Sequence, residues 1–142
     1  MISKSRYDII QKLLADLART FAQLVGLDTP EALEEIREYY HSWLQIDPDQ
    51  LVEGDPSGML HYLLQERGLS VPQLALLAAL LAQEAEILSQ NQQIERAIAQ
   101  LKKALVIFEY VEANAEVFSF NRLDRIQRSQ MLYRDLSSKH DS

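Results

Sequence analysis

The chain contains no cysteine, and this absence excludes several kinds of site at once. Disulfides, thiolate ligands for a metal ion and a cysteine nucleophile all require a residue that this protein lacks. A reducing compartment is compatible with this composition, and we take a cytoplasmic location as the default. With 142 residues, of which 47% are hydrophobic and 25% charged, residues 1–142 are expected to form a single globular domain.

Histidine is scarce, and no recognised catalytic motif is present. The three histidines, His41, His61 and His140, do not stand in a spaced metal-binding pattern with an acidic partner. An HEXXH motif, a glycine-rich phosphate loop and a nucleophile elbow are all absent. Glutamates one helical turn apart within residues 31–38 could ligate a cation beside His41, but acidic first turns also stabilise a helix through its dipole. We therefore predict no catalytic residues, no metal site and no cofactor, and we expect that the protein is not an enzyme.

Long uncharged segments are lacking as well. Residues 68–82 carry no charge, but this stretch includes Pro72 and is shorter than the about 20 apolar residues that a bilayer span needs. It is therefore predicted to be a buried central helix. Near the N-terminus, Asp8, Lys12 and Asp16 interrupt the apolar pattern, which is unlike the uncharged core of a secretory signal. We expect no association with a membrane.

Basic residues are outnumbered by acidic ones, and the two kinds are unevenly distributed. The formal net charge of −7 disfavours nonspecific binding to nucleic acid, because the phosphate backbone would repel the protein. Between residues 28 and 55 the chain is acidic, with Arg37 as the one basic residue. Arg122, Arg125 and Arg128 repeat every third residue and so form one basic stripe on the last helix. This stripe could clamp an acidic partner or pair with the acidic second helix of the same or another subunit, and ordinary surface pairing is the alternative.

Apolar residues at helical spacing are abundant along the whole chain. No convincing alternation of apolar and polar residues occurs, so strands are not expected. The pattern predicts an all-α fold of five or six helices, packed as antiparallel hairpins in a helical array or bundle. The predicted helices cover roughly residues 5–25, 29–46, 56–67, 70–90, 92–114 and 121–137.

Residues typical of helix boundaries lie at the ends of these segments. Side chains that can cap a helix N-terminus stand at the start of four of them. They are Ser5 (with Asp8), Thr29 (before Pro30), Asp55 (before Pro56) and Ser70 (with Gln73). The dipeptide Asp47-Pro48 is expected to end the second helix, because the residue before a proline is disfavoured in the α conformation.

The strongest pattern is a predicted helical hairpin within residues 74–113. A helix saturated with leucine and alanine is followed by a polar break at residues 89–93 and then by a second helix. On that second helix, Ala97, Leu101 and Ala104 share one face. Because alanine lets two helix backbones approach closely, this face predicts a tightly packed antiparallel pair.

This hairpin resembles a tetratricopeptide-type helix pair. In that family the second helix carries an alanine, a large residue four positions on and an alanine three further on, as Ala97, Leu101 and Ala104 do. The glycine position of the family's first helix falls on Ala85. The resemblance implies a groove between helices that binds a peptide from another protein. No carboxylate-clamp motif can be transferred residue by residue.

A weaker resemblance covers more of the chain. Residues 36–48 are similar to the same second helix with its closing proline, but Ile36 and Trp43 replace the small residues. These larger side chains must splay the neighbouring helix or fill a gap. The whole chain also resembles a bacterial family of small uncharacterised proteins with one such pair near the C-terminus, which implies a fold but no activity.

Aromatic residues at the end of the fifth helix exceed what one neighbouring helix could bury. They are Phe108, Tyr110, Phe118 and Phe120. Either the last helix or a second subunit must cover them, and we favour a homodimer built partly from residues 105–120. Together with the basic stripe, these four aromatic residues form the predicted interaction surface.

Two function classes follow from the sequence. The favoured hypothesis is a non-enzymatic protein–protein interaction module with an unidentified protein partner. The alternative is a regulatory protein that binds a small ligand or a metal, with its pocket between the acidic second helix and the region of His41 and Trp43. The two can be distinguished by whether Tyr40, His41 and Trp43 line a cavity or are tightly packed.

Overall fold

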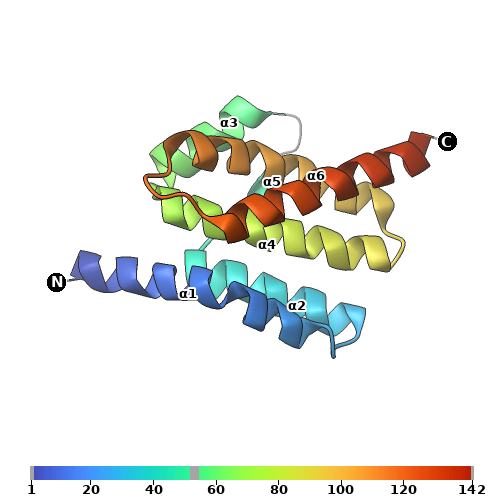
Figure 1. Ribbon diagram of the computed structural model, residues 1–142, viewed down its shortest axis with the longest axis horizontal. Coiled ribbons are helices and arrows are strands. Elements are labelled where there is room, and N and C mark those ends of the chain that lie inside the picture. The colour runs from blue at the N-terminus through green and yellow to red at the C-terminus, as the bar shows by residue number, and fades with distance from the viewer. Residues whose placement is uncertain (1, 52–54, 142) are drawn as a thin grey trace.

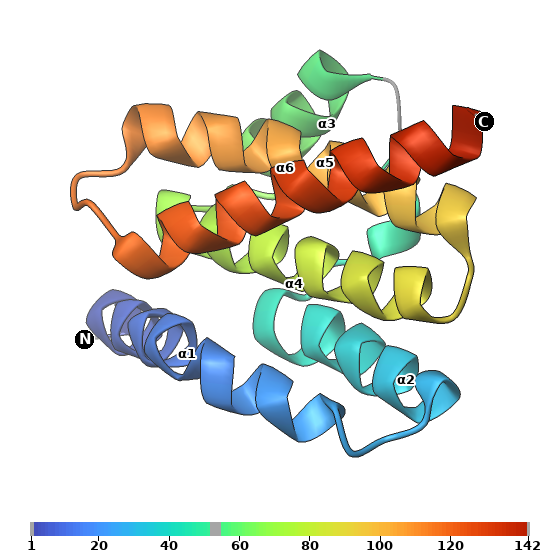
Figure 2. The same cartoon turned by 45° about the vertical axis from the view of Figure 1, so that its right-hand side comes forward.

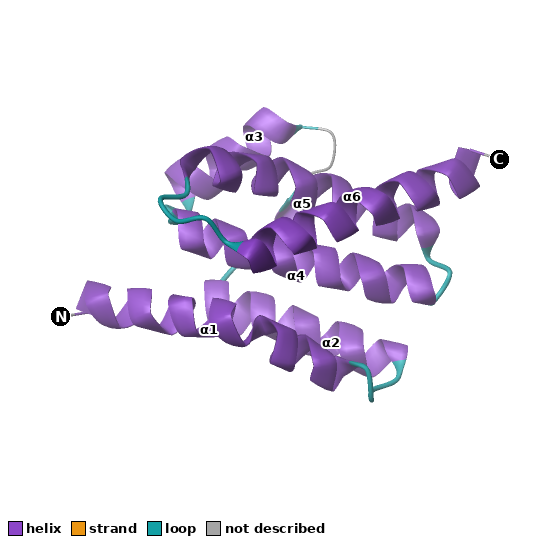
Figure 3. Ribbon diagram, viewed as in Figure 1, coloured by secondary structure: helices purple, strands orange, loops and turns teal. Residues whose placement is uncertain are grey.

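The structure is a computed structural model, and it describes residues 2–51 and 55–141 (Figure 1). Over these ranges it contains six α-helices and no strand, as the colouring by secondary structure shows (Figure 3). The helices are α1 (Ile2–Leu24), α2 (Thr29–Tyr39), α3 (Pro56–His61), α4 (Val71–Gln90), α5 (Ile94–Asn114) and α6 (Phe120–Asp141). The prediction of an all-α fold with five or six helices is confirmed.

Helix α4 forms the centre of the molecule. Thirteen of its 20 residues are buried, whereas a surface helix buries one stripe. Neighbours therefore surround it: α1 and α2 pack on one side, and α5 and α6 on the other (Figures 1 and 2). Within the described ranges, α4 is the one helix long and apolar enough to cross a membrane, but 72% of its most apolar window is buried inside the protein. Helix α4 is therefore the buried central helix that the sequence predicts.

Helices α4 and α5 form the predicted antiparallel hairpin. The small face of α5 meets α4 directly, since Ala97, Leu101 and Ala104 are each 0% exposed. Near the turn, Ala97 and Leu101 pack with Ala85 of α4, and Leu136 of α6 closes this end of the core. The polar break at residues 89–93 makes the reversal of chain direction, as expected.

Two of the predicted helix starts are confirmed in detail. At the start of α4, the Ser70 Oγ accepts a hydrogen bond from the Gln73 amide at 3.3 Å, and the Gln73 Oε1 accepts one from the Ser70 amide at 2.8 Å. At the start of α3, the Asp55 Oδ1 accepts a hydrogen bond from the Gly58 amide at 3.0 Å. A Cβ atom on Gly58 would lie 2.1 Å from the Asp55 Oδ2, so a larger residue there would displace the capping carboxylate.

Three predicted boundaries are wrong. Helix α1 already begins at Ile2, so its backbone does not start at Ser5. The cap of α2 is Asp28 rather than Thr29, because the Asp28 carboxylate accepts the Glu31 amide at 2.9 Å. The second helix also ends before Asp47: it closes in a π-helical turn, η1 (Tyr40–Leu44), after which Gln45 takes a left-handed conformation with φ of 53°.

A second π-helical turn, η3 (Tyr62–Glu66), extends α3, and a short 3₁₀ turn, η2 (Pro48–Gln50), links the second helix to the third. Gly68 follows η3 with φ of +63°, a conformation that glycine adopts without strain. These short elements bring residues 45–51 and 55–69 against the α4–α5 hairpin, and Leu63 is fully buried there.

Candidate functional site

A groove lies between α1 and α6, which both pack against α4 (Figure 2). Residues 76–82, in the middle of α4, are buried, so the groove reaches α4 only toward its two ends. Two pockets occupy this α1–α6 groove, one toward each end, and Arg125 of α6 lines both. The α4 residues that line them run from Val71 to Gln90, which corresponds to about 28 Å at 1.5 Å per residue.

The first pocket lies where α5 ends, and we call it the α5-end pocket. Its volume is about 570 Å³, within the range of small-ligand sites. Apolar side chains from three helices line it, among them Leu14 of α1, Val71 of α4, and Phe108 and Val111 of α5. The mouth is polar, with Gln11, Asn114, Ser119, Asn121, Arg122 and Arg125. Glu116 is the one acidic residue of the lining.

The second pocket lies near the start of α2, and we call it the α2-end pocket. Its volume is about 400 Å³. Phe21 and Leu24 of α1 and Ile87 of α4 give it an apolar wall, whereas Glu86 and Arg128 make the opposite wall charged. Arg125 stands between the two pockets, with its guanidinium carbon 5.9 Å from the centre of the Phe21 ring.

The predicted basic stripe forms the α6 wall of the groove, and its members have different environments. Arg122 forms an ion pair with Glu112 and donates a hydrogen bond to the Val117 carbonyl at 3.1 Å. Arg128 forms an ion pair with Glu86 at 2.8 Å across the groove floor. Two of the three arginines are therefore neutralised within the chain.

Arg125 is the exception in this stripe. Among the side chains that the structure describes, no carboxylate lies within 4.0 Å of its guanidinium group. Burial lowers the pKa of Arg125, and the nearby positive charge of Arg128 lowers it further, while Glu86 and Asp124 act in the opposite direction. Arginine stays protonated in proteins, so this site holds a partly desolvated cation without a close counterion.

The four aromatic residues of the predicted interaction surface differ in exposure. Phe108 is 1% exposed and belongs to the hydrophobic core, because it lies on the same face of α5 as Ala104, which packs against α4. Tyr110 is half-buried against the same core. Phe118 and Phe120 are 59% and 80% exposed, and their rings meet edge to face with centroids 4.8 Å apart. The structure therefore keeps these two phenylalanines at the surface and removes Phe108 from it.

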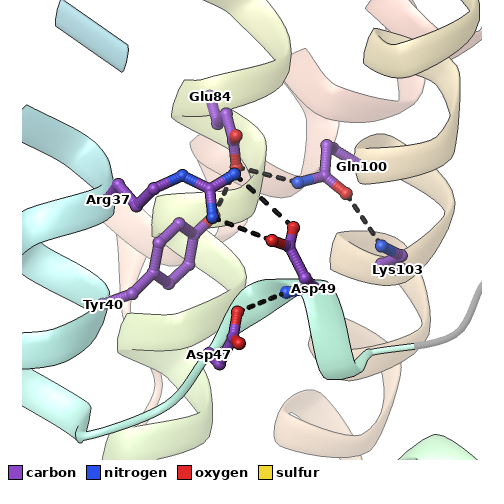
Figure 4. A network of polar contacts seen from close by, with 7 residues as sticks. All are labelled: Arg37, Tyr40, Asp47, Asp49, Glu84, Gln100 and Lys103. Carbon is purple, nitrogen blue, oxygen red and sulfur yellow. Dashed lines mark hydrogen bonds and ion pairs between the residues drawn. The ribbon is translucent and has the colours of Figure 1, made fainter. Parts of the chain in front are cut away.

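A buried polar network lies on the other side of α4 (Figure 4). Glu84, in the middle of the apolar helix, is 4% exposed. Its Oε1 accepts a hydrogen bond from the Tyr40 hydroxyl at 2.8 Å and another from the Gln100 amide group at 2.8 Å. The Lys103 ammonium group donates to the Gln100 Oε1 at 3.0 Å, so the network joins η1, α4 and α5.

Arg37 and Asp49 continue this network toward the surface. The Arg37 guanidinium donates to both oxygens of Asp49, at 3.2 and 3.5 Å. Burial lowers the pKa of Arg37, but the hydrogen bond to Asp49 and the charges of Asp49 and Glu84 outweigh it, so the pKa is raised overall. Burial also raises the pKa of Tyr40 well above its ordinary value, and the negative charge of Glu84 raises it further.

This network is a structural element that sequence reasoning missed. The signal was present, since Glu84 lies one helical turn from Leu80, Leu81 and Leu88 and so shares the buried face of α4. Its partner Tyr40 is 44 residues away, and no spacing rule connects them. Every buried polar side-chain atom among the described residues has a hydrogen-bond partner, so the network is satisfied and holds η1 against the hairpin.

Tyr40, His41 and Trp43 do not converge on a cavity. Tyr40 is buried in the core, His41 is exposed, and Trp43 stacks on Tyr39 with ring centroids 4.2 Å apart. Neither groove pocket includes any of these residues. Within the described part of the chain there is also no group of three or more histidine, aspartate or glutamate residues placed to hold a metal ion.

No protein-family model, curated protein or solved structure matches this chain.

Proposed function

We propose that the protein is a tetratricopeptide-like interaction module without enzymatic activity, and that its α1–α6 groove binds a helical segment of another protein. The observation that carries this proposal is the groove itself, in which apolar side chains of α1, α4 and α5 lie beside the basic stripe of α6. A groove with an apolar floor between helices is the usual receptor for an amphipathic helix.

The length of the groove supports a helical partner. The α4 residues that line it extend over about 28 Å, which matches a helix of about 19 residues. Such a helix would place apolar side chains at positions i, i+3, i+4 and i+7 toward the two pockets. It would replace water over surface that the flanking helices leave uncovered.

The charges of the groove specify the polar face of the partner. Arg125 lies at the junction of the two pockets without a close counterion, so an acidic side chain near the middle of the partner would stabilise the complex. Arg122 and Arg128 already have acidic partners in the chain and contribute less. We therefore propose a partner helix that is apolar on one face and carries at least one central acidic residue.

Selection from a random peptide display library tests this proposal. The bait is the purified protein, and peptides of about 19 residues match the groove. Enriched sequences are expected to combine helical apolar spacing with a central aspartate or glutamate. Their affinity is expected to fall with rising salt, because partly exposed charges are screened.

Three alanine-to-tryptophan variants locate the binding site. Ala15 lines the α5-end pocket and Ala22 the α2-end pocket, and both are exposed, so a tryptophan there blocks the groove without entering the core. Ala113 is exposed on α5 and lines neither pocket, so Ala113→Trp is the matched control. Selected peptides should bind the control normally and each groove variant at least about tenfold more weakly. The proposal is wrong if no peptide is enriched or if Ala15→Trp and Ala22→Trp leave binding unchanged.

A homodimer is a second proposal, and the surface proposed for it is smaller than the residues 105–120 expected from the sequence. Helix α6 packs against α5, so apolar side chains within residues 105–111 have a neighbour within the subunit. The exposed residues Val117 and Phe118 of the loop after α5, with Phe120 at the start of α6, form an apolar loop region beside the α5-end pocket. We propose that any contact between two copies uses this loop.

A further inference from the structure

The α5-end pocket combines an apolar interior with a cation at its mouth. Leu14, Val71, Phe108 and Val111 present hydrocarbon surface to a space of about 570 Å³. Apolar lining with a few convergent polar groups is the usual composition of a small-molecule site.

The polar groups at the mouth favour a negative charge. Arg125 has no carboxylate within 4.0 Å among the described side chains, and Arg122 is oriented by Glu112 and the Val117 carbonyl. Asn121 and Ser119 stand beside these arginines at the start of α6. Because Arg122 is paired with Glu112 and the acidic residue of the lining, Glu116, is exposed, Arg125 is the lining cation that is available to an anionic group.

The location of Arg125 also restricts the shape of the ligand. The contact between its guanidinium group and the Phe21 ring holds Arg125 at the boundary between the two pockets. An anionic group bound to Arg125 would therefore lie at the inner edge of the α5-end pocket. The rest of the ligand would extend over Phe108 and Val111.

We propose that the α5-end pocket binds a small amphiphilic carboxylate, with the carboxylate on Arg125 and an apolar tail against Phe108 and Val111. This site lies at one end of the groove and does not depend on a protein partner. A cationic amphiphile of the same length is disfavoured by the charge of Arg125. A neutral one would lose the charge-assisted hydrogen bonds to Arg125.

Calorimetric titration with three eight-carbon probes tests the charge preference. The probes are octanoate, 1-octanol and octylammonium, which share a tail and differ in the head group. Octanoate is expected to bind with a Kd at or below about 1 mM, about tenfold tighter than octanol, and octylammonium should bind most weakly. Equal binding of octanoate and octanol, or no binding of octanoate at such concentrations, would overturn the proposal.

Matched variants tie the binding to this pocket. Arg125→Gln should weaken octanoate binding about tenfold and leave octanol binding unchanged. Arg125→Lys should retain part of the preference for octanoate over octanol. Ala15→Trp fills the pocket from an exposed position and should weaken both probes, whereas Ala113→Trp should affect neither. If octanoate binds Ala15→Trp as tightly as the wild type, it binds elsewhere and the proposal fails.

The outcomes for the pocket and for the groove can be separated. Ala22→Trp blocks only the α2-end pocket, so it should weaken selected peptides and leave octanoate binding unchanged. If no peptide is selected but octanoate binds tightly, the ligand-site proposal is supported and the interaction-module proposal is refuted. If peptides are selected but octanoate does not bind, only the ligand-site proposal is refuted.

Discussion

Replacing Tyr40 by phenylalanine tests whether the buried network stabilises the fold. The substitution removes one hydroxyl from a side chain that is 1% exposed and leaves no cavity of significant size. The lost hydrogen bond, 2.8 Å long, runs to the carboxylate of Glu84, which is 4% exposed. Hydrogen bonds to charged groups contribute about 1.5–3 kcal/mol each. Because Glu84 keeps its bond to Gln100, we expect a loss of about 2 kcal/mol in the free energy of unfolding.

Urea unfolding at 25 °C provides the measurement. For a chain of this size, a loss of about 2 kcal/mol should lower the midpoint by about 1 M with an unchanged m-value. Tyr62→Phe is the matched control, because the Tyr62 hydroxyl donates to the Gln50 Oε1 at 2.7 Å in an exposed setting. That variant should lose less than about 1 kcal/mol, since water replaces the partner.

A double-mutant cycle separates the charge of Glu84 from the geometry of the bond. Glu84→Gln retains a side-chain oxygen that can accept from Tyr40 but removes the negative charge. Charge-assisted hydrogen bonds are about twice as strong as neutral ones, so Tyr40→Phe should cost about half as much in the Glu84→Gln background. If Tyr40→Phe costs no more than Tyr62→Phe in the wild-type background, the reasoning about the buried network is refuted.

Three further predictions concern the same core and the exposed loop. The raised pKa of Tyr40 means that its contribution to stability is complete below the ordinary tyrosine pKa of about 10 and is lost as the pH rises from there toward the folded-state value. Unfolding measured between about pH 9 and 11 should therefore show a steeper loss for the wild type than for Tyr40→Phe, and parallel curves would contradict this. Ala104→Leu should destabilise the protein by about 1–3 kcal/mol, because Ala104 is 0% exposed at the close contact of α4 and α5, and a melting temperature equal to that of the wild type would argue against overpacking. Replacing Phe118 and Phe120 together by serine should change stability by less than about 0.5 kcal/mol, since both side chains are exposed. Light scattering over a range of concentrations should show any dimer of the wild type weakened in this double variant, and an unaffected dimer would place the interface elsewhere.

Local signals predicted the helices well and their ends less well. Ser70 and Gln73 form the expected capping box because both partners lie within one helical turn, so no distant residue takes part. Thr29 and Asp28 are both good caps on adjacent positions, and local preference could not choose between them. The second helix ends in a π-helical turn whose first residue, Tyr40, bonds to the distant Glu84, and residues 40–48 alone do not reveal this contact.

The candidate site was less predictable than the fold. The spacing of Arg122, Arg125 and Arg128 correctly placed them on one stripe of α6. Their different environments come from Glu112 on α5 and Glu86 on α4, and the spacing within α6 contains no information about those partners. Phe108 was expected at the surface, although it lies one helical turn after Ala104 and so shares the face of α5 that packs against α4.

The sequence by itself determined the all-α fold, the apolar central helix and the close contact of Ala97, Leu101 and Ala104 with it. These follow from a period of 3.6 residues and from side-chain size, which are properties of residues near one another in the chain. The tertiary structure decided the burial of Phe108 and Glu84, the isolation of Arg125 and the opening of the groove between α1 and α6. Each of these depends on how helices far apart in the chain pack together, and that arrangement is set by the sum of many weak contacts rather than by any local motif.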